Sequence, residues 1–235
     1  MKKGSAPGLE PLGLAAMYSE ALLIKQDARG IVLSGSIFAA DLGDVSAHVK
    51  ITSGDGRRLY AECLSSALAQ AIGLSVPRPY LVMVHPSACP DSLNEPTWGF
   101  GSTTQHPAIA APLQGHDEET YAVIRRWARF HALCVFDEWI ANHDRSPEHL
   151  FYDGRDFTLI DHGEALPETL AARQRATGGN HQLDRAALLL SEFERHAALR
   201  KLKDAGAAIP TLPLHQAKNV LHTQWTQNGL LSWTA

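Results

Sequence analysis

Short apolar runs alternate with turn-forming residues through the first quarter of the chain. The runs at 21–25 and 31–33 flank Asp-Ala-Arg-Gly at 27–30, which predicts a strand, a turn and a strand. A third strand is expected at 47–51, between two glycine-containing turns. Three sequential strands joined by short turns predict an antiparallel sheet.

The next segment changes to a helical period. Apolar residues recur at helical spacing from about residue 58 to 72, and Gly73 follows as a stop signal. Pro77 and Pro79 exclude a continuation of this helix. The uninterrupted apolar run at 80–84 then predicts a buried strand.

The second half of the chain reads as mostly helical. Five prolines in residues 85–117 predict a long connection or lid without regular structure. A single helix is expected over 118–141, with one apolar stripe formed by Tyr121, Ile124, Ala128, His131, Val135 and Trp139. An Asp-Gly turn at 153–154 predicts a hairpin over 150–160, and helices are expected at 184–204 and 214–227.

These patterns predict an α+β protein with three parts. A tail rich in glycine and proline covers residues 1–19 and is expected to be irregular. Strands and one helix form a first part at 20–85 with a small antiparallel sheet. Residues 86–235 form a mostly helical second part that contains the 150–160 hairpin.

Composition narrows the class of protein. The chain has 235 residues, and its 21 basic and 25 acidic residues give a net charge of −4, which does not favour direct binding to nucleic acid. The 45% hydrophobic content is typical of a globular protein. Three widely spaced cysteines exclude a disulfide framework and indicate a reducing compartment. The sequence contains no apolar run of membrane-spanning length, so we expect a cytoplasmic protein without membrane contact.

The most informative residues flank the predicted hairpin. Asn-His-Asp-Arg at 142–145 precedes it and Asp-His-Gly at 161–163 follows it. Because a hairpin returns the chain to its starting point, Asp144 and Asp161 are expected to lie close together. Two neighbouring carboxylates repel each other unless a cation neutralises them. On the hairpin alone, plain turns and a surface ion pair explain these residues equally well.

The first part of the chain favours a phosphoryl-transfer site. Lys50 lies within a predicted strand, and Glu62 follows twelve residues later on the predicted helix. A protein kinase places a phosphate-binding lysine and its glutamate partner in this order, followed by a catalytic aspartate and a metal-binding aspartate. Upstream, Ser-Gly-Ser at 34–36 predicts a small-residue turn whose backbone N–H groups bind phosphate, with Gly35 and Ser36 as ligands.

Together these motifs resemble the compact HipA-like kinases and, more distantly, the phosphatidylinositol 3/4-kinases. The resemblance covers about residues 20–170, and its most specific parts are Asn-His-Asp-Arg and the Leu-Ile-Asp-His-Gly-Glu-Ala-Leu segment at 159–166. It implies a two-lobed kinase fold, ATP with Mg²⁺ as cofactors, and transfer to a serine or threonine of a protein. HipA-like proteins are often bacterial toxins or regulators, so a regulatory partner protein is a further expectation.

The resemblance also implies residue roles. Lys50 and Glu62 would anchor the nucleotide, Asp144 would be the catalytic base and Asp161 would hold the metal. Asn142 and Arg145 belong to the same catalytic loop and are expected to shape it. By their order along the chain, Leu81 to Val84 are expected to contact the adenine.

One residue departs from the family pattern. His149 stands five residues after Asp144, where the family has an asparagine that binds the second metal. Mg²⁺ prefers oxygen ligands, whereas imidazole suits Mn²⁺ or Zn²⁺. Three interpretations remain open: a kinase with an altered metal preference such as Mn²⁺, a nucleotide-binding regulator without transfer, and a local shift in which Glu148 supplies the oxygen.

Two further hypotheses concern other residues. His131, His143, Asp144 and Asp161 match the ligand types of a metal-dependent His-Asp phosphohydrolase, although that fold needs its ligands on helices. Ser34 and Ser36 are candidates for autophosphorylation, because phosphate added to the predicted loop would repel the phosphates of ATP. The sequence shows no helix-turn-helix signal, so any DNA contact would require another chain.

Overall fold

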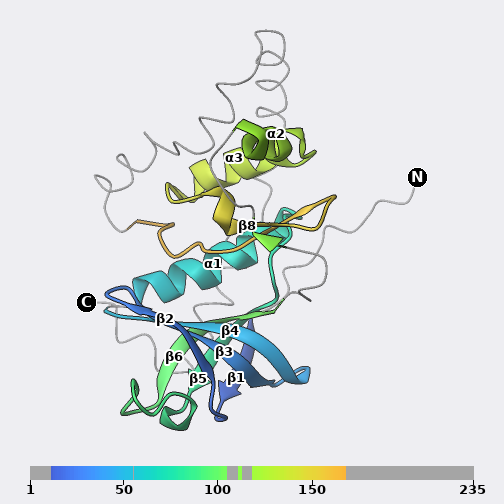
Figure 1. Ribbon diagram of the computed structural model, residues 1–235. Helices are drawn as coiled ribbons and strands as arrows, with labels where there is room; N and C mark the ends of the chain where they lie inside the picture. The colour runs from blue at the N-terminus through green and yellow to red at the C-terminus, as the bar shows by residue number, and fades with distance from the viewer. Residues whose placement is uncertain (1–11, 55, 105–110, 113–117, 168–235) are drawn as a thin grey trace, which may run out of the picture.

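The computed structural model describes residues 12–54, 56–104, 111–112 and 118–167. The chain folds as an α+β protein in which α1 lies between the sheet and the part that contains α2, α3 and β8 (Figure 1). The helices are α1 (Arg57–Ala71), α2 (Glu118–Arg126), α3 (Phe130–Trp139) and two 3₁₀ turns, η1 (Pro86–Ala88) and η2 (Pro147–His149). The strands are β1 (Gly13–Met17), β2 (Leu22–Asp27), β3 (Gly30–Ala39), β4 (Gly43–Thr52), β5 (Pro79–Val84), β6 (Thr97–Thr103), β7 (Ala111–Pro112), β8 (Leu150–Tyr152) and β9 (Phe157–Leu159).

The main sheet closes on itself. Its strand order is β1-β5-β6-β4-β3-β2, and β1 also pairs with β3, so five strands form a closed barrel. The pairing of β1 with β5 is parallel, whereas the other pairings are antiparallel. The predicted antiparallel sheet is therefore present, but it is larger than predicted and is a mixed barrel.

Three strands lie where irregular structure was predicted. The strand β1 falls within the predicted 1–19 tail, and β6 and β7 fall within the predicted connection at 85–117. The sheet therefore extends to Thr103, beyond the expected boundary near residue 86. A Cβ atom at Gly101 of β6 would collide with Val82 of β5, so this glycine permits close strand packing instead of marking a turn.

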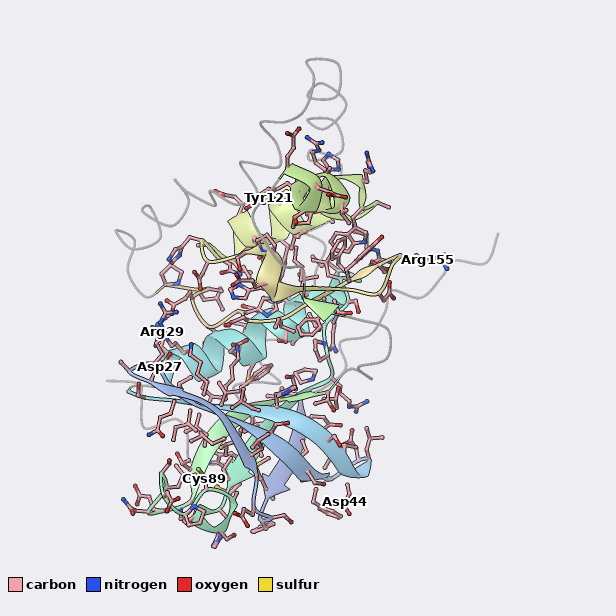
Figure 2. All side chains as sticks on the ribbon, viewed as in Figure 1. Asp27, Arg29, Asp44, Cys89, Tyr121 and Arg155 are labelled. Atoms are coloured by element: carbon pink, nitrogen blue, oxygen red, sulfur yellow. The ribbon has the colours of Figure 1, made fainter. Side chains whose placement is uncertain are left out.

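The expected phosphate-binding turn at Ser34, Gly35 and Ser36 is wrong. These residues lie inside β3 and pair with residues 46–48 of β4, so their backbone groups belong to the barrel. Each end of β3 instead adjoins a different turn. Figure 2 places Asp27 and Arg29 at one end of the sheet and Asp44 at the other. The autophosphorylated loop proposed for Ser34 and Ser36 therefore has no counterpart in the fold.

The predicted helix over 58–72 is confirmed as α1, and its apolar face is buried. Leu59 and Cys63 pack with Leu81 and Phe100 of the barrel, while Leu68 faces the helical part of the molecule. Gly73 has φ +77°, the left-handed conformation that commonly ends a helix. Since α1 contacts both the barrel and the helical part, it fixes their relative position.

The single helix predicted over 118–141 is interrupted. Helix α2 ends at Arg126 and α3 begins at Phe130. Between them, the buried Trp127 turns toward the β8–β9 hairpin and donates from Nε1 to Oδ1 of Asp156 at 2.5 Å. Tyr121 and Ile124 of the predicted apolar stripe are buried, as expected. In α3, however, the buried residues are Phe130, Leu133 and Phe136, which were not part of the predicted stripe.

The predicted hairpin is confirmed. Strands β8 and β9 pair antiparallel, and the side chain of Asp153 accepts hydrogen bonds from the backbone N–H groups of Arg155 and Asp156. The helices predicted at 184–204 and 214–227 lie outside the described residues. Among the helices that the structure describes, none has the length and apolar character needed to cross a membrane.

Candidate functional site

Lys50 joins the barrel to the rest of the molecule. It lies on β4, opposite Val32 of β3 and Phe100 of β6. Its Nζ lies 2.7 Å from Oε1 of Glu62 on α1 and 2.9 Å from Oδ1 of Asp161, which follows β9. Three segments that are distant in the sequence therefore meet at one ammonium group.

Burial and charge shift the pKa values of this cluster. Burial acts to lower the pKa of Lys50, but the carboxylates of Glu62 and Asp161 outweigh it and the net pKa is raised. Burial raises the pKa of Glu62, although Lys50 and the backbone N–H of His162, which donates to Oε2 at 2.8 Å, oppose this shift. Lys50 is therefore held firmly as a cation.

Asp161 combines an unusual backbone with an exposed carboxylate. Its φ of +59° is left-handed, a conformation that costs free energy in a non-glycine residue and is common at functional sites. Burial acts to raise the pKa of Asp161, but the ammonium of Lys50 outweighs it and the pKa is lowered. Its side chain is 38% exposed, so the ionised carboxylate remains accessible from solvent.

The N-terminal turn of α1 binds the segment that follows Asp161. Arg57 donates from Nη1 to the carbonyl of Ala165 at 3.0 Å and from Nη2 to the carbonyl of Gly163 at 3.3 Å. Arg58 forms an ion pair with Glu164 at 2.8 Å. Together with the bond from His162 to Glu62, these contacts align the segment that carries Asp161 with α1.

Asn142 and Arg145 hold the 142–145 loop in place through buried hydrogen bonds. Arg145 is fully buried and binds Asp137 through Nε at 3.0 Å and Nη2 at 3.1 Å, and it donates from Nη1 to the carbonyl of Ile160 at 2.5 Å. Asn142 donates to Asp137 and accepts from the backbone N–H of Asp144. Neither residue lines the two cavities described below, and their hydrogen bonds position the loop.

Asp144 is exposed at a small opening of about 110 Å³. Lys50 and Asp161 line the same opening, so the two aspartates face a common space as the hairpin argument predicted. The tip of the β2–β3 hairpin forms a further part of the rim through Lys25, Asp27, Arg29 and Gly30. Figure 2 labels Asp27 and Arg29 at this tip. This turn lies near Lys50, because Lys50 pairs with Val32 close to the end of β4 where Thr52 pairs with Gly30.

A larger cavity of about 880 Å³ lies beside the small one and shares Lys50, Glu62 and Asp161 with it. Its barrel wall comes from β3, β4 and β6, and its other wall comes from the β8–β9 hairpin and the residues that follow β9. Leu81 to Val84, where adenine contacts were expected, do not line this cavity. Strand β5 pairs with β1 and β6, and the side chains of Leu81 and Val84 are buried in two separate apolar cores.

His149 lies beside Asp161, with Nε2 at 3.7 Å from Oδ2. Burial lowers the pKa of His149, which makes its ring neutral at neutral pH. Its Nδ1 is buried and has no hydrogen-bond partner among the described residues. Glu148 is exposed on η2 and lines neither cavity.

The ligand set considered for a phosphohydrolase does not assemble. Among the described residues, no group of three or more His, Cys, Asp and Glu side chains is arranged to hold a metal ion. His131 lies on α3 with its ring against Phe130. We therefore discard this hypothesis.

Sequence reasoning missed two parts of the site. The turn at 27–30 was predicted, but its position over Lys50 requires the register that pairs Val32 with Lys50. This register could have been obtained by pairing residues outward from the β3–β4 turn, which would have placed the 27–30 turn near Lys50. The wall formed by Phe100, Ser102 and Thr103 gave no signal, because β6 was not recognised as a strand.

Comparison with known proteins adds one finding. No curated protein matches the chain. A protein-family model described as HipA-like kinase matches residues 44–216, which includes Lys50, Glu62, the 142–145 loop and Asp161. This match spans most of the sequence and contains every residue of the charged cluster, so the chain belongs to the HipA-like kinase family.

Proposed function

We propose that the protein transfers the γ-phosphoryl group of ATP to a serine or threonine hydroxyl of another protein. The observation that carries this proposal is the position of Lys50 between Glu62 and Asp161. A cation held by two carboxylates at the junction of two cavities is suited to bind the phosphates of a nucleotide. Membership of the HipA-like kinase family supports the same reaction class.

The two cavities suggest how the nucleotide would lie. The larger cavity is wide enough for a nucleoside and has mostly apolar walls, as is usual for small-molecule sites. The phosphates would extend past Lys50 toward the small opening, where Asp144 is exposed. The barrel on one side and the helical part on the other fit a two-lobed kinase architecture.

The site also suits a divalent cation. Asp161 offers an ionised and partly exposed carboxylate, which is the ligand type that Mg²⁺ prefers. Bound there, Mg²⁺ would neutralise charge on the phosphates of the nucleotide. The neutral imidazole of His149 adds a nitrogen donor next to Asp161, which favours Mn²⁺ over Mg²⁺ as the working metal.

Asp144 is suited to act on the acceptor. Its carboxylate would orient the acceptor hydroxyl and take its proton as the hydroxyl oxygen bonds to the γ-phosphorus. The bond between that phosphorus and the β–γ bridging oxygen breaks, and ADP leaves with the electron pair. Asn142 and Arg145 hold the loop so that Asp144 stays exposed at the opening.

One observation favours a second candidate function. His149 occupies the place where an oxygen ligand is expected, 3.7 Å from Asp161. A protein that binds nucleotide but lacks the second metal would act as a nucleotide-dependent regulator with little or no transfer. The two candidates share the same nucleotide site and differ only in turnover.

Two measurements test the proposal. Thermal unfolding of the full chain with ATP and Mg²⁺, and then with ATP and Mn²⁺, should show a higher midpoint than without nucleotide, because a ligand that binds the native state stabilises it. Transfer from γ-labelled ATP to protein acceptors should be detected with at least one metal. Stabilisation without transfer would select the regulator. The absence of both effects would refute nucleotide binding and, with it, the proposed function.

A further inference from the structure

His48 lines the larger cavity and has no part in the phosphoryl transfer proposed above. On β4, alternate residues face opposite sides of the sheet, so His48 shares a face with Lys50. Ala47 and Val49 point into the barrel, where both are fully buried. The imidazole of His48 therefore lines the same cavity as the ammonium group of Lys50, two residues along β4.

His48 is chemically available. Its side chain forms no hydrogen bond or ion pair within the described part of the chain, and it is exposed toward the cavity. Burial of part of the ring lowers the pKa of His48, so the ring is neutral at neutral pH. A neutral imidazole presents an uncharged aromatic face that can stack on another ring.

The surroundings of His48 fit a flat ligand. On the same sheet face its cross-strand neighbours are Ser34 and Ser102, which are too small to cover the ring. The other wall of the cavity is apolar and comes from Phe151, Leu159 and Ile160. A planar ring between these walls would be sandwiched by an imidazole on one face and by apolar side chains on the other.

We propose that His48 stacks on the base of the bound nucleotide and favours purine over pyrimidine bases at this site. The inference rests on the proposed nucleotide site, since Lys50 on the same strand would hold the phosphates of the same molecule. Stacking tolerates different bases, because every base presents a π face. ATP and GTP should therefore bind with similar affinity, and pyrimidine nucleotides, with a smaller stacking area, should bind more weakly.

The test uses the full-length chain and its binding of ATP, GTP, CTP and inorganic tripolyphosphate by calorimetry. His48→Ala should weaken ATP and GTP binding by about tenfold or more, the range found when a stacking residue is removed. His48→Phe should retain most of the affinity, since it keeps the aromatic face. Neither variant should change tripolyphosphate binding, because that probe has no base.

Controls separate this inference from the proposed function. His85→Ala removes a histidine that lies outside both cavities, and it should bind ATP as the wild type does. Wild-type affinity in His48→Ala, or equal losses in His48→Ala and His48→Phe, would refute stacking while leaving nucleotide binding intact. A parallel loss of tripolyphosphate binding would also refute it, since the substitution would then have disturbed the phosphate site. If the wild-type chain bound no nucleotide, the proposed function itself would fail.

Discussion

The ammonium of Lys50 lies 2.9 Å from Oδ1 of Asp161, so a barrel strand and the segment after the β8–β9 hairpin share one ion pair. The same ammonium binds Glu62, which is almost fully buried. Two carboxylates around one cation leave a net negative charge, and burial makes each charge depend on the other two. Changes at any of the three should therefore affect both stability and phosphate binding.

Replacing Lys50 with methionine should reduce both the stability of the protein and its phosphate binding. Glu62 would remain buried without its cation, which should lower the free energy of unfolding by about 2–3 kcal/mol. Loss of the phosphate-binding charge should slow transfer by about 10²–10³-fold. Urea unfolding and labelled-phosphate transfer would measure the two effects. Arg155→Met, at an exposed turn, should change neither, and wild-type transfer in Lys50→Met would contradict the assigned role.

Asp144→Asn should separate catalysis from binding. The amide keeps the shape of the side chain but cannot accept the hydroxyl proton, so kcat should fall by about 10²–10⁴-fold. The Kd for ATP should change little, because the ion pairs of Lys50 within the described residues are with Glu62 and Asp161 and not with Asp144. Single-turnover transfer and calorimetry would test this. A weaker Kd with an unchanged rate would assign Asp144 to nucleotide binding instead.

His149→Asn should raise transfer with Mg²⁺. The amide oxygen replaces an imidazole beside Asp161 and suits the harder cation, so the ratio of the Mn²⁺ rate to the Mg²⁺ rate should fall by about tenfold. Initial rates with each metal would show the change. Unchanged or reduced transfer with Mg²⁺ would count against this account of the site.

Glu148→Gln is the matched control for that experiment. Glu148 is exposed and lines neither cavity, so the substitution should leave the metal dependence of transfer as in the wild type. A specific loss of transfer in Glu148→Gln would instead support the third interpretation, in which Glu148 supplies the oxygen ligand.

Arg145→Met should destabilise the protein without a direct effect on chemistry. It would leave the fully buried Asp137 without its cation, at a cost of about 3–5 kcal/mol. Burial already raises the pKa of Asp137, and Arg145 is the main group that opposes this shift. Adding Asp137→Leu to Arg145→Met should restore part of the lost stability in urea unfolding. A double variant no more stable than Arg145→Met would show that Asp137 is not the source of the loss.

Stability should also depend on pH through His162. Its ring is fully buried, and burial holds the pKa of His162 well below the ordinary value of 6.5. The unfolded chain therefore binds a proton below about pH 6.5 that the folded chain does not bind. Stability should fall with acidification in this window, by about 1.4 kcal/mol per pH unit for one proton.

His162→Phe should reduce that slope between pH 7 and pH 5. The pKa values of His48 and His149 are also lowered, so part of the slope should remain. The lowered pKa of Asp161 acts only below about pH 4 and does not contribute in this window. Urea unfolding at several pH values would test the prediction, and an unchanged slope in His162→Phe would contradict it.

Local signals predicted the parts of the fold that depend on local chemistry. The helical spacing of Leu59, Cys63 and Leu68 and the stop at Gly73 were sufficient to predict α1. The Asp-Gly turn at 153–154 was sufficient for the hairpin, and through it for the proximity of Asp144 and Asp161. These features arise within one element or between neighbours in the sequence.

Barrel closure could not be predicted in the same way. The sequence Gly-Leu-Ala-Ala-Met of β1 has no β-branched residue, and it is extended because it pairs with β5 and β3. Gly35 and Gly101 resemble turn glycines, but each lies in a strand where a side chain would crowd a neighbour. The break after α2 depends on a contact of Trp127 with Asp156, far along the chain.

The closed barrel leaves β2 in a position unlike that of the other strands. In the described part of the sheet, β2 pairs with β3 alone, whereas every strand of the ring pairs with at least two others. Separation of β2 from the sheet would break the hydrogen bonds between β2 and β3 and would leave the five-strand barrel closed. Of the strands that line the small opening, β2 is thus the one whose displacement would break the fewest strand pairings.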